Sequence, residues 1–67
     1  LSANLNTLLF GLENININGW IIIEDICKSQ INNWNIIDSI LNTNDQYDTF
    51  MVDTNMWSWV YVVKRIY

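Results

Sequence analysis

Two adjacent acids, Glu24 and Asp25, are the residues of this chain whose position best suits chemistry. They end the stretch "GWIIIEDI", in which four large apolar residues precede them. A carboxylate at the end of a buried strand can bind a hard cation such as Mg²⁺ or act as a base. Because side chains alternate along a strand, the two acids are expected to point to opposite faces. The alternative is that both are ordinary polar residues near a helix N-terminus, where negative charge is favoured.

The other reactive or stacking side chains predict structure more strongly than chemistry. Cys27 is the single cysteine and the chain has no histidine, so neither a disulfide nor a nucleophilic dyad is supported, and a small buried residue is expected. Trp57 and Trp59 could stack on a ligand, but their spacing favours two residues that cover a core face. Lys64 and Arg65 are expected at a solvated strand end.

Length and composition limit the chain to one small domain and exclude several partners. The 67 residues are 51% hydrophobic and 15% charged, which indicates a folded chain. A net charge of −4 with three basic residues argues against nucleic acid as a partner. No apolar run approaches the roughly 20 residues of a membrane span and no signal peptide is present, so we expect a cytoplasmic protein without a membrane partner. Two glycines in total leave no phosphate-binding loop.

The pattern of apolar residues predicts the order helix, strand, helix, strand, strand. Leucines spaced by three and four predict a helix over residues 2–13 with Ser2 as its N-cap, and a turn-rich connection follows over 14–19. A strand is expected over residues 20–25, whose first four residues are apolar at successive positions, which is typical of a strand covered on both faces. A helix is expected over 30–42 with Ser29 as its N-cap, and strands over 46–54 and 57–66 form an antiparallel hairpin. This order predicts an α/β layered domain with a mixed sheet.

Nearly the whole chain resembles the C-terminal part of class I S-adenosylmethionine-dependent methyltransferases. "SANLNTLLFGLENININGWIIIEDI" resembles their fourth helix and fifth strand, most closely in the branch of sugar O-methyltransferases and cephalosporin-hydroxylase-like proteins. "INNWNIIDSILN" stands where their fifth helix lies, and "YDTFMVDTNMWSWVYVVKRIY" where their antiparallel sixth and seventh strands lie. The resemblance implies that residues 1–67 are the C-terminal portion of a Rossmann-like seven-stranded methyltransferase sheet. With the doubly apolar "WVYVV", it also places 57–65 between 20–25 and 46–54.

The resemblance implies a segment of an enzyme that moves a methyl group from S-adenosylmethionine to an oxygen of a small molecule such as a sugar. Asp25, with Glu24 beside it, matches the position where that branch binds Mg²⁺. The glycine-rich cofactor loop is not in this chain, so the segment alone is expected to be inactive and to bind no S-adenosylmethionine. The alternative is a small non-catalytic interaction module that pairs through an exposed strand edge and its aromatic hairpin. An unpaired edge at 20–25 also predicts self-association.

Overall fold

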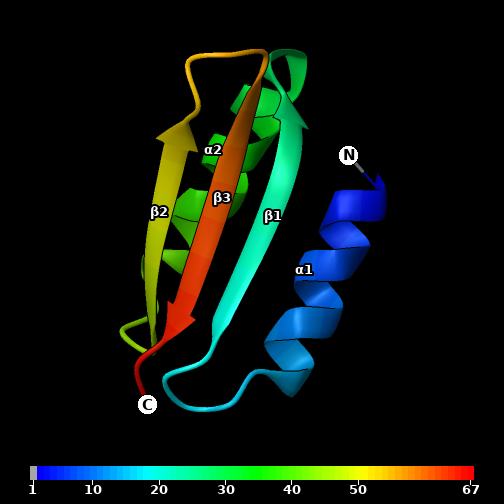
Figure 1. Ribbon diagram of the computed structural model, residues 1–67. Coiled ribbons are helices and arrows are strands. Elements are labelled where there is room, and N and C mark those ends of the chain that lie inside the picture. Colours follow the sequence, from blue (N-terminus) through cyan, green and yellow to red (C-terminus); the bar gives the residue numbers. More distant parts are fainter. Residues whose placement is uncertain (1) are drawn as a thin grey trace.

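The computed structural model describes residues 2–67, with side chains from Ala3 onward. The elements along the chain are two helices, one short 3₁₀ turn and three strands (Figure 1): α1 (Ser2–Asn14), β1 (Trp20–Cys27), η1 (Lys28–Gln30), α2 (Ile31–Leu41), β2 (Tyr47–Asp53) and β3 (Ser58–Arg65). The predicted order of helices and strands is therefore confirmed. Among the described residues, no helix has the length and apolar character needed to cross a bilayer.

The first helix and its exit turn lie close to where the sequence predicts them. The expected N-cap side chain of α1, that of Ser2, lies outside the described side chains. The connection turns back at Asn18, whose φ of 67° is a left-handed conformation that asparagine tolerates. Gly19 is needed for space, because a Cβ there would lie 2.8 Å from the carbonyl oxygen of Asn16. This tight turn leads directly from α1 into β1.

The second helix begins differently from the prediction. β1 runs on to Cys27, two residues beyond its expected end, and a 3₁₀ turn follows. Ser29 lies inside this turn, so the prediction that it caps the helix was wrong. Gln30 occupies the N-cap position of α2 and makes no side-chain capping hydrogen bond. The start of α2 therefore depends on packing rather than on a capping side chain.

The three strands form one antiparallel sheet in the order β1-β3-β2. Ile22 lies opposite Val62, which lies opposite Phe50 on the other side. The last strand of the chain is therefore central, as predicted. Both outer strands are antiparallel to it, so the sheet is not mixed, and that expectation was wrong.

The predicted fold class, a portion of a Rossmann-like seven-stranded methyltransferase sheet, was also wrong. The described residues form two helices and a three-stranded antiparallel sheet, without parallel ladder pairing. The misleading signal was the doubly apolar strand at 20–25, which is typical of interior strands of parallel sheets. In the structure this strand is an edge strand with one face on the core and one face in solvent. The architecture is a two-layer α+β arrangement.

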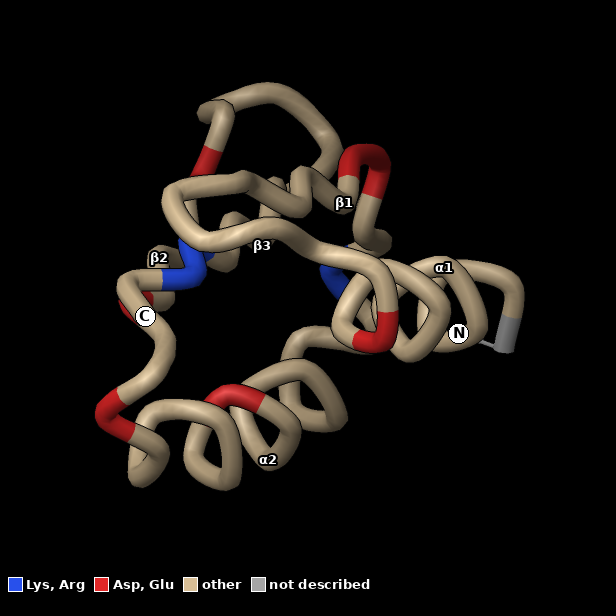
Figure 2. Tube along the Cα trace, turned by 90° about the horizontal axis from the view of Figure 1, so that it is seen from below, with Lys and Arg blue, Asp and Glu red and all other residues tan. Residues whose placement is uncertain are grey.

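The core lies between the sheet and the helices, which cover the same face of the sheet (Figures 1 and 2). Trp34 of α2 and Tyr61 of β3 are fully buried, with ring centroids 5.6 Å apart at a tilted angle that suits aromatic pairs. The remaining buried side chains come from α1, β1 and β3: Leu8, Ile21, Ile23, Ile26 and Val63. The opposite face of the sheet carries no helix among the described residues (Figure 1).

Candidate functional site

The two predicted metal ligands lie on a β-bulge in β1. Ile23 pairs with Tyr61 and Ile26 pairs with Trp59, so Glu24 and Asp25 together face the single residue between those partners on β3. Asp25 adopts a φ of 56°, in the left-handed region that non-glycine residues rarely occupy. The strand thus bends where the acids lie.

The bulge changes which residues face the core. Ile23 and Ile26 are three positions apart, yet both point inward, with 2% and 0% of their surfaces exposed. Alternation is therefore interrupted between them, and Glu24 and Asp25 are both exposed. The expectation that the two acids point to opposite faces applies to a regular strand, and β1 is not regular at this point.

A metal ion would find few ligands here. In the described part of the chain, no three or more cysteine, aspartate or glutamate side chains are grouped in a way that could hold a metal ion. The exposed pair could supply two carboxylates at most, and Mg²⁺ would have to take its other ligands from water or a substrate. The chain therefore does not form a self-contained metal site. The assignment of Asp25 and Glu24 as Mg²⁺ ligands stays a prediction.

S-adenosylmethionine does not fit the described residues either. The glycines lie inside α1 and in the turn before β1, and neither adopts a positive φ. No glycine-rich loop leads from a strand into a helix N-terminus, which is the arrangement that brings backbone close to a nucleotide-like cofactor.

Cys27 is exposed, so the prediction of a buried cysteine was wrong. The cause is the bulge, which puts Ile26 into the core and leaves its neighbour in solvent. With no histidine in the chain, no base is available to activate the thiol.

One hydrogen bond inside the domain joins ionisable side chains that the sequence did not single out. The Tyr61 hydroxyl donates to Oδ1 of Asp38 at 2.8 Å and ties β3 to α2. Burial, and then this hydrogen bond, raise the pKa of Tyr61 above its ordinary value, while Thr49 acts in the opposite direction. A tyrosine held neutral in this way is a structural link rather than a base. In the sequence, the one sign of this hydrogen bond was the position of Asp38 next to the apolar stripe of its predicted helix.

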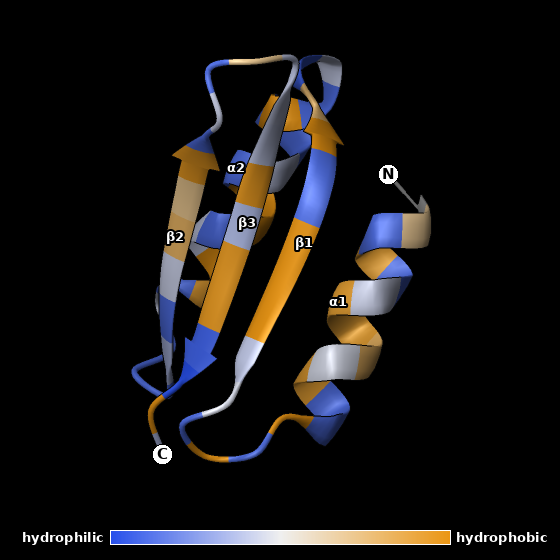
Figure 3. Ribbon diagram, in the orientation of Figure 1, coloured by the Kyte–Doolittle hydropathy of each residue, from blue (hydrophilic) through white to orange (hydrophobic). Residues whose placement is uncertain are grey.

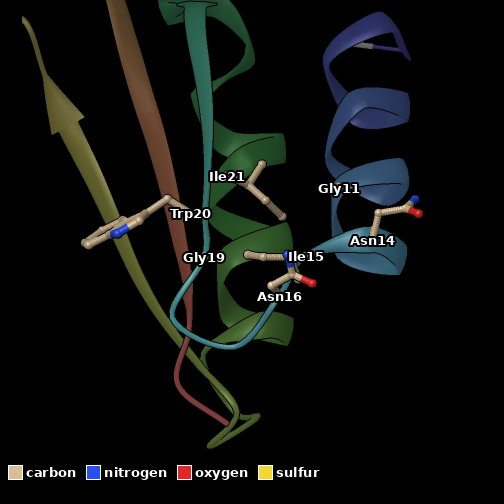
Figure 4. A pocket seen from close by; sticks show the side chains of 7 residues that line it. All are labelled: Gly11, Asn14, Ile15, Asn16, Gly19, Trp20 and Ile21. Carbon is tan, nitrogen blue, oxygen red and sulfur yellow. The ribbon is translucent and has the colours of Figure 1, made fainter.

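An open cavity of about 310 Å³ lies where α1 turns into β1 (Figure 4). Gly11, Asn14 and Asn16 are among its lining residues, and Ile21 points across it toward α1. The indole of Trp20 points to the other side of β1 (Figure 4). None of the lining side chains is an acid, a base or a nucleophile, so the cavity offers no catalytic group.

The uncovered face of the sheet is the most distinctive surface of the molecule. We call it the outer face and define it by the side chains that point away from the helices in three neighbouring rows: Trp20, Lys64 and Asp48; Ile22, Val62 and Phe50; Val60 and Val52. Figure 3 views the sheet from this side and shows apolar segments on adjacent strands. These side chains are apolar except for Lys64 and Asp48, and the exposed acid Glu24 follows Ile22 in the same alternation, beside Val60 where β1 bulges. Antiparallel sheets with one solvated face usually carry polar residues there.

Charges lie at the two ends of the outer face. Lys64 and Asp48 are opposite each other in the register, and the Lys64 ammonium lies 5.2 Å from the ring centre of Trp20. Arg65, next to Lys64, donates from Nη1 to the carbonyl oxygen of Ile15. Neither cation is therefore simply a solvated strand end, as the sequence suggested. Glu24 lies at the other end beside Val60, so only the centre of the outer face is without charge.

The β2–β3 turn carries a further exposed aromatic side chain. Trp57 is 84% exposed, so the prediction that it covers the core was wrong, whereas Trp59 does pack against the core. Asp53 Oδ1 accepts a hydrogen bond from the amide of Asn55, and Thr54 Oγ1 donates to the carbonyl of Ser58. The turn thus holds the indole in solvent by ordered hydrogen bonds.

Neither a family model, nor a curated protein, nor a solved structure matches this chain. The resemblance to methyltransferases therefore stays a prediction, and the function has to be argued from the surfaces described above.

Proposed function

We propose that this chain is a non-catalytic interaction module that docks the outer face of its sheet on an apolar protein surface. The observation that carries the proposal is the uncharged centre of the outer face, in which Ile22, Val62 and Phe50 lie beside Val60 and Val52. Contiguous exposed apolar patches of a few hundred Å² mark interaction sites in soluble proteins. A partner with an apolar, weakly charged surface suits this centre, because Lys64 and Asp48 already lie opposite each other at one end.

The available area matches that of an interaction patch. A fully exposed aromatic side chain presents roughly 150–250 Å². Trp20 and Phe50, each about half exposed, together offer on the order of 200 Å² on this basis. With the aliphatic rows beside them, the outer face reaches the few hundred Å² that mark interaction sites. Exposed tryptophan is also the residue type most often found at interface hot spots.

Site-specific cross-linking tests this proposal. A photoreactive phenylalanine analogue in place of Ile22, on the outer face, should yield one discrete cross-linked product in cells of the source. Phe50→Lys in the same chain should abolish the product, because it buries a charge in the contact. Ile17→Lys is the matched control, since Ile17 is exposed but lies outside the sheet. A diffuse set of products, or equal loss with both lysine variants, would contradict the proposal.

A second copy of the chain is expected on the same face when no other partner is present. Sedimentation at increasing concentration should show association by the unchanged chain and by Ile17→Lys, but not by Phe50→Lys. A monomer at every concentration would remove this part of the proposal.

The resemblance supports a second candidate, a segment of an S-adenosylmethionine-dependent O-methyltransferase that is inactive alone and located in the cytoplasm. The observation that favours it is that Glu24 and Asp25 are both solvent-exposed, as carboxylates facing a metal and a small-molecule acceptor would need to be. Under this proposal, the reading frame upstream encodes a glycine-rich strand–loop–helix. An unrelated upstream sequence would refute the second candidate and leave the first intact.

A further inference from the structure

The strand β2 lies at an edge of the sheet, and its backbone there is open to a further strand. We infer that an extended segment of another protein, carrying basic residues, pairs antiparallel with β2 and becomes a fourth strand. In this mode of recognition, main-chain hydrogen bonds supply the affinity and side chains supply the specificity. The inference concerns the edge and not the outer face, so it goes beyond the function proposed above and does not depend on it.

Hydrogen bonds just beyond the two ends of β2 show which of its residues bond to β3. At one end, the amide of Ile66 donates to the carbonyl oxygen of Gln46. At the other end, the amide of Thr54 donates to the carbonyl oxygen of Ser58. Residues of an antiparallel strand alternate between those that bond to a given neighbour and those that do not. Because β2 keeps an unbroken register with β3, its even-numbered residues bond to that strand.

The odd-numbered residues of β2 therefore turn their backbone N–H and C=O groups toward the free edge. They form a regular row without a bulge: Tyr47, Thr49, Met51 and Asp53. The amide of Tyr47 donates to the carbonyl oxygen of Asn44 within the preceding turn. No backbone hydrogen bond from outside the sheet reaches Thr49, Met51 or Asp53 in the described part of the chain. These groups are available to the ladder of an added strand.

The other edge of the sheet, at β1, is interrupted. The amide of Arg65 donates to the carbonyl oxygen of Gly19. By the same alternation, only Trp20 and Ile22 face outward before the bulge at residues 24–25. Bulges of this kind are one way in which proteins block pairing at a sheet edge. In addition, α1 lies alongside β1, whereas no described helix or strand lies beyond β2 (Figure 1). The edge that can extend is therefore that of β2.

Charge favours a basic segment over a second copy of β2. Residues 44–57 contain no basic residue and three acids: Asp45, Asp48 and Asp53. Lys64 lies opposite Asp48, but an uncharged residue lies opposite Asp53. Pairing of two β2 strands would bring two sets of these acids to one edge, and like charges oppose such pairing. Lysine or arginine opposite Asp48 and Asp53 would instead form favourable cross-strand pairs.

The probe for the test is a labelled peptide of seven residues, the length of β2. It alternates valine and threonine, except for lysines at the positions opposite Asp48 and Asp53. Fluorescence anisotropy with the full chain should show binding of this peptide. A second peptide with glutamates in place of the lysines should bind at least roughly threefold more weakly, the scale of exposed charge pairs. High salt should remove this difference.

Methyl groups on the peptide nitrogens provide matched controls for strand pairing. In the antiparallel register, the peptide N–H groups opposite Thr49 and Met51 bond to β2, whereas the N–H opposite Phe50 points away. N-methylation opposite Thr49 or Met51 should weaken binding roughly tenfold, the scale of a lost hydrogen bond with an unpaired acceptor. N-methylation opposite Phe50 should leave binding nearly unchanged. A peptide bound to the outer face would not follow this alternation.

Hydrogen exchange followed by NMR locates the contact. The lysine peptide should slow exchange at the amides of Thr49 and Met51, and should leave exchange at the outward amide of Ile22 on β1 unchanged. The proposal would be overturned by equal binding of the methylated peptides, by equal affinity of the lysine and glutamate peptides, by protection at Ile22 instead of β2, or by no binding. These results are separate from docking through the outer face, which the cross-linking experiment decides.

Discussion

Asp25 allows a direct test of the bulge, because its backbone conformation and its carboxylate make separate predictions. Its φ of 56° places a side chain with a Cβ in the left-handed region, which costs roughly 1–2 kcal/mol for an ordinary L-residue. Aspartate bears less of this cost because its short polar side chain can bond locally. Glycine has no such steric cost. It loses more conformational freedom on folding, however, which lowers stability by about 0.5–1 kcal/mol relative to alanine.

The steric cost and the cost in conformational freedom together predict that the glycine and alanine variants rank in opposite order of stability at positions 24 and 25. At position 25, glycine should be more stable than alanine by about 1 kcal/mol, since only alanine keeps the steric cost. At position 24, which is not in the left-handed region, alanine should be more stable than glycine by about 0.5–1 kcal/mol. For a domain of this size, 1 kcal/mol shifts the thermal midpoint by roughly 4–8 °C, which is easily measured.

The assay is thermal unfolding of the four single variants, followed by far-UV circular dichroism and by tryptophan fluorescence. Trp34 is fully buried and reports on the core. Low protein concentration keeps association through the outer face from contributing. If glycine and alanine ranked in the same order at positions 24 and 25, the left-handed conformation of Asp25 would be refuted, and with it the explanation for two exposed acids.

Three further changes test the packing of the domain. Because burial and its hydrogen bond raise the pKa of Tyr61, the folded state favours the neutral phenol, and stability should fall as the pH rises above about 10. Thermal midpoints measured from neutral to alkaline pH should fall less in Tyr61→Phe; parallel curves would argue against this link. Gly19→Ala should cost about 1–3 kcal/mol in urea unfolding, because the new Cβ would meet the Asn16 carbonyl, and an unchanged midpoint would mean that the turn relaxes freely. Ile26→Ala should cost about 2–5 kcal/mol in the same experiment, and its exposed neighbour Cys27→Ala close to nothing; similar losses at both positions would contradict the reversed alternation after the bulge.

The sequence predicted the order of the elements and the central strand, but not the antiparallel character of the whole sheet. Leucine spacing in 2–13 and alternation in 46–54 are local signals, and both elements formed within a residue or two of the expected bounds. The central place of the last strand followed from the resemblance to methyltransferases together with the apolar residues of "WVYVV" on both faces. A central strand contacts neighbours on both sides, so its pattern carries more information than that of an edge strand.

The sequence allows a bulge at residues 24–25 as an alternative to a regular strand, but it does not favour one, because nothing local marks it. Most positions with a positive φ carry glycine or asparagine, as Asn18 and Asn55 do, but position 25 carries an aspartate that also reads as a strand-end acid. The bulge is set by pairing with β3, where Trp59 must meet Ile26. Burial of Cys27 was misjudged for the same reason, since one extra residue exchanges the two faces of a strand.

Trp57 and Trp59 show a second limit of pattern reasoning. Both follow the same alternation, yet one packs on the core and the other is in solvent, because β3 begins only at Ser58 and Trp57 belongs to the turn. Strand boundaries are uncertain by one or two residues even in a known structure. A stacking or interface role for Trp57 therefore could not be separated from a core role until its position relative to the strand was known.

Docking on the outer face, as proposed, would couple partner binding to folding in this chain. Large aliphatic or aromatic side chains are worth roughly 1.5–3 kcal/mol each when fully buried. Ile22 and Phe50 on the outer face remain about half exposed, so much of that free energy is not realised by the domain alone. Their burial by a partner would add a sizeable fraction of the 5–15 kcal/mol by which whole domains are stable. A ligand that binds only the folded chain stabilises it by mass action, so occupation of the outer face should raise the unfolding midpoint as it is titrated. The inner side chains of the doubly apolar strands form the core of the domain. Their outer side chains remain exposed, where a second protein layer can cover them.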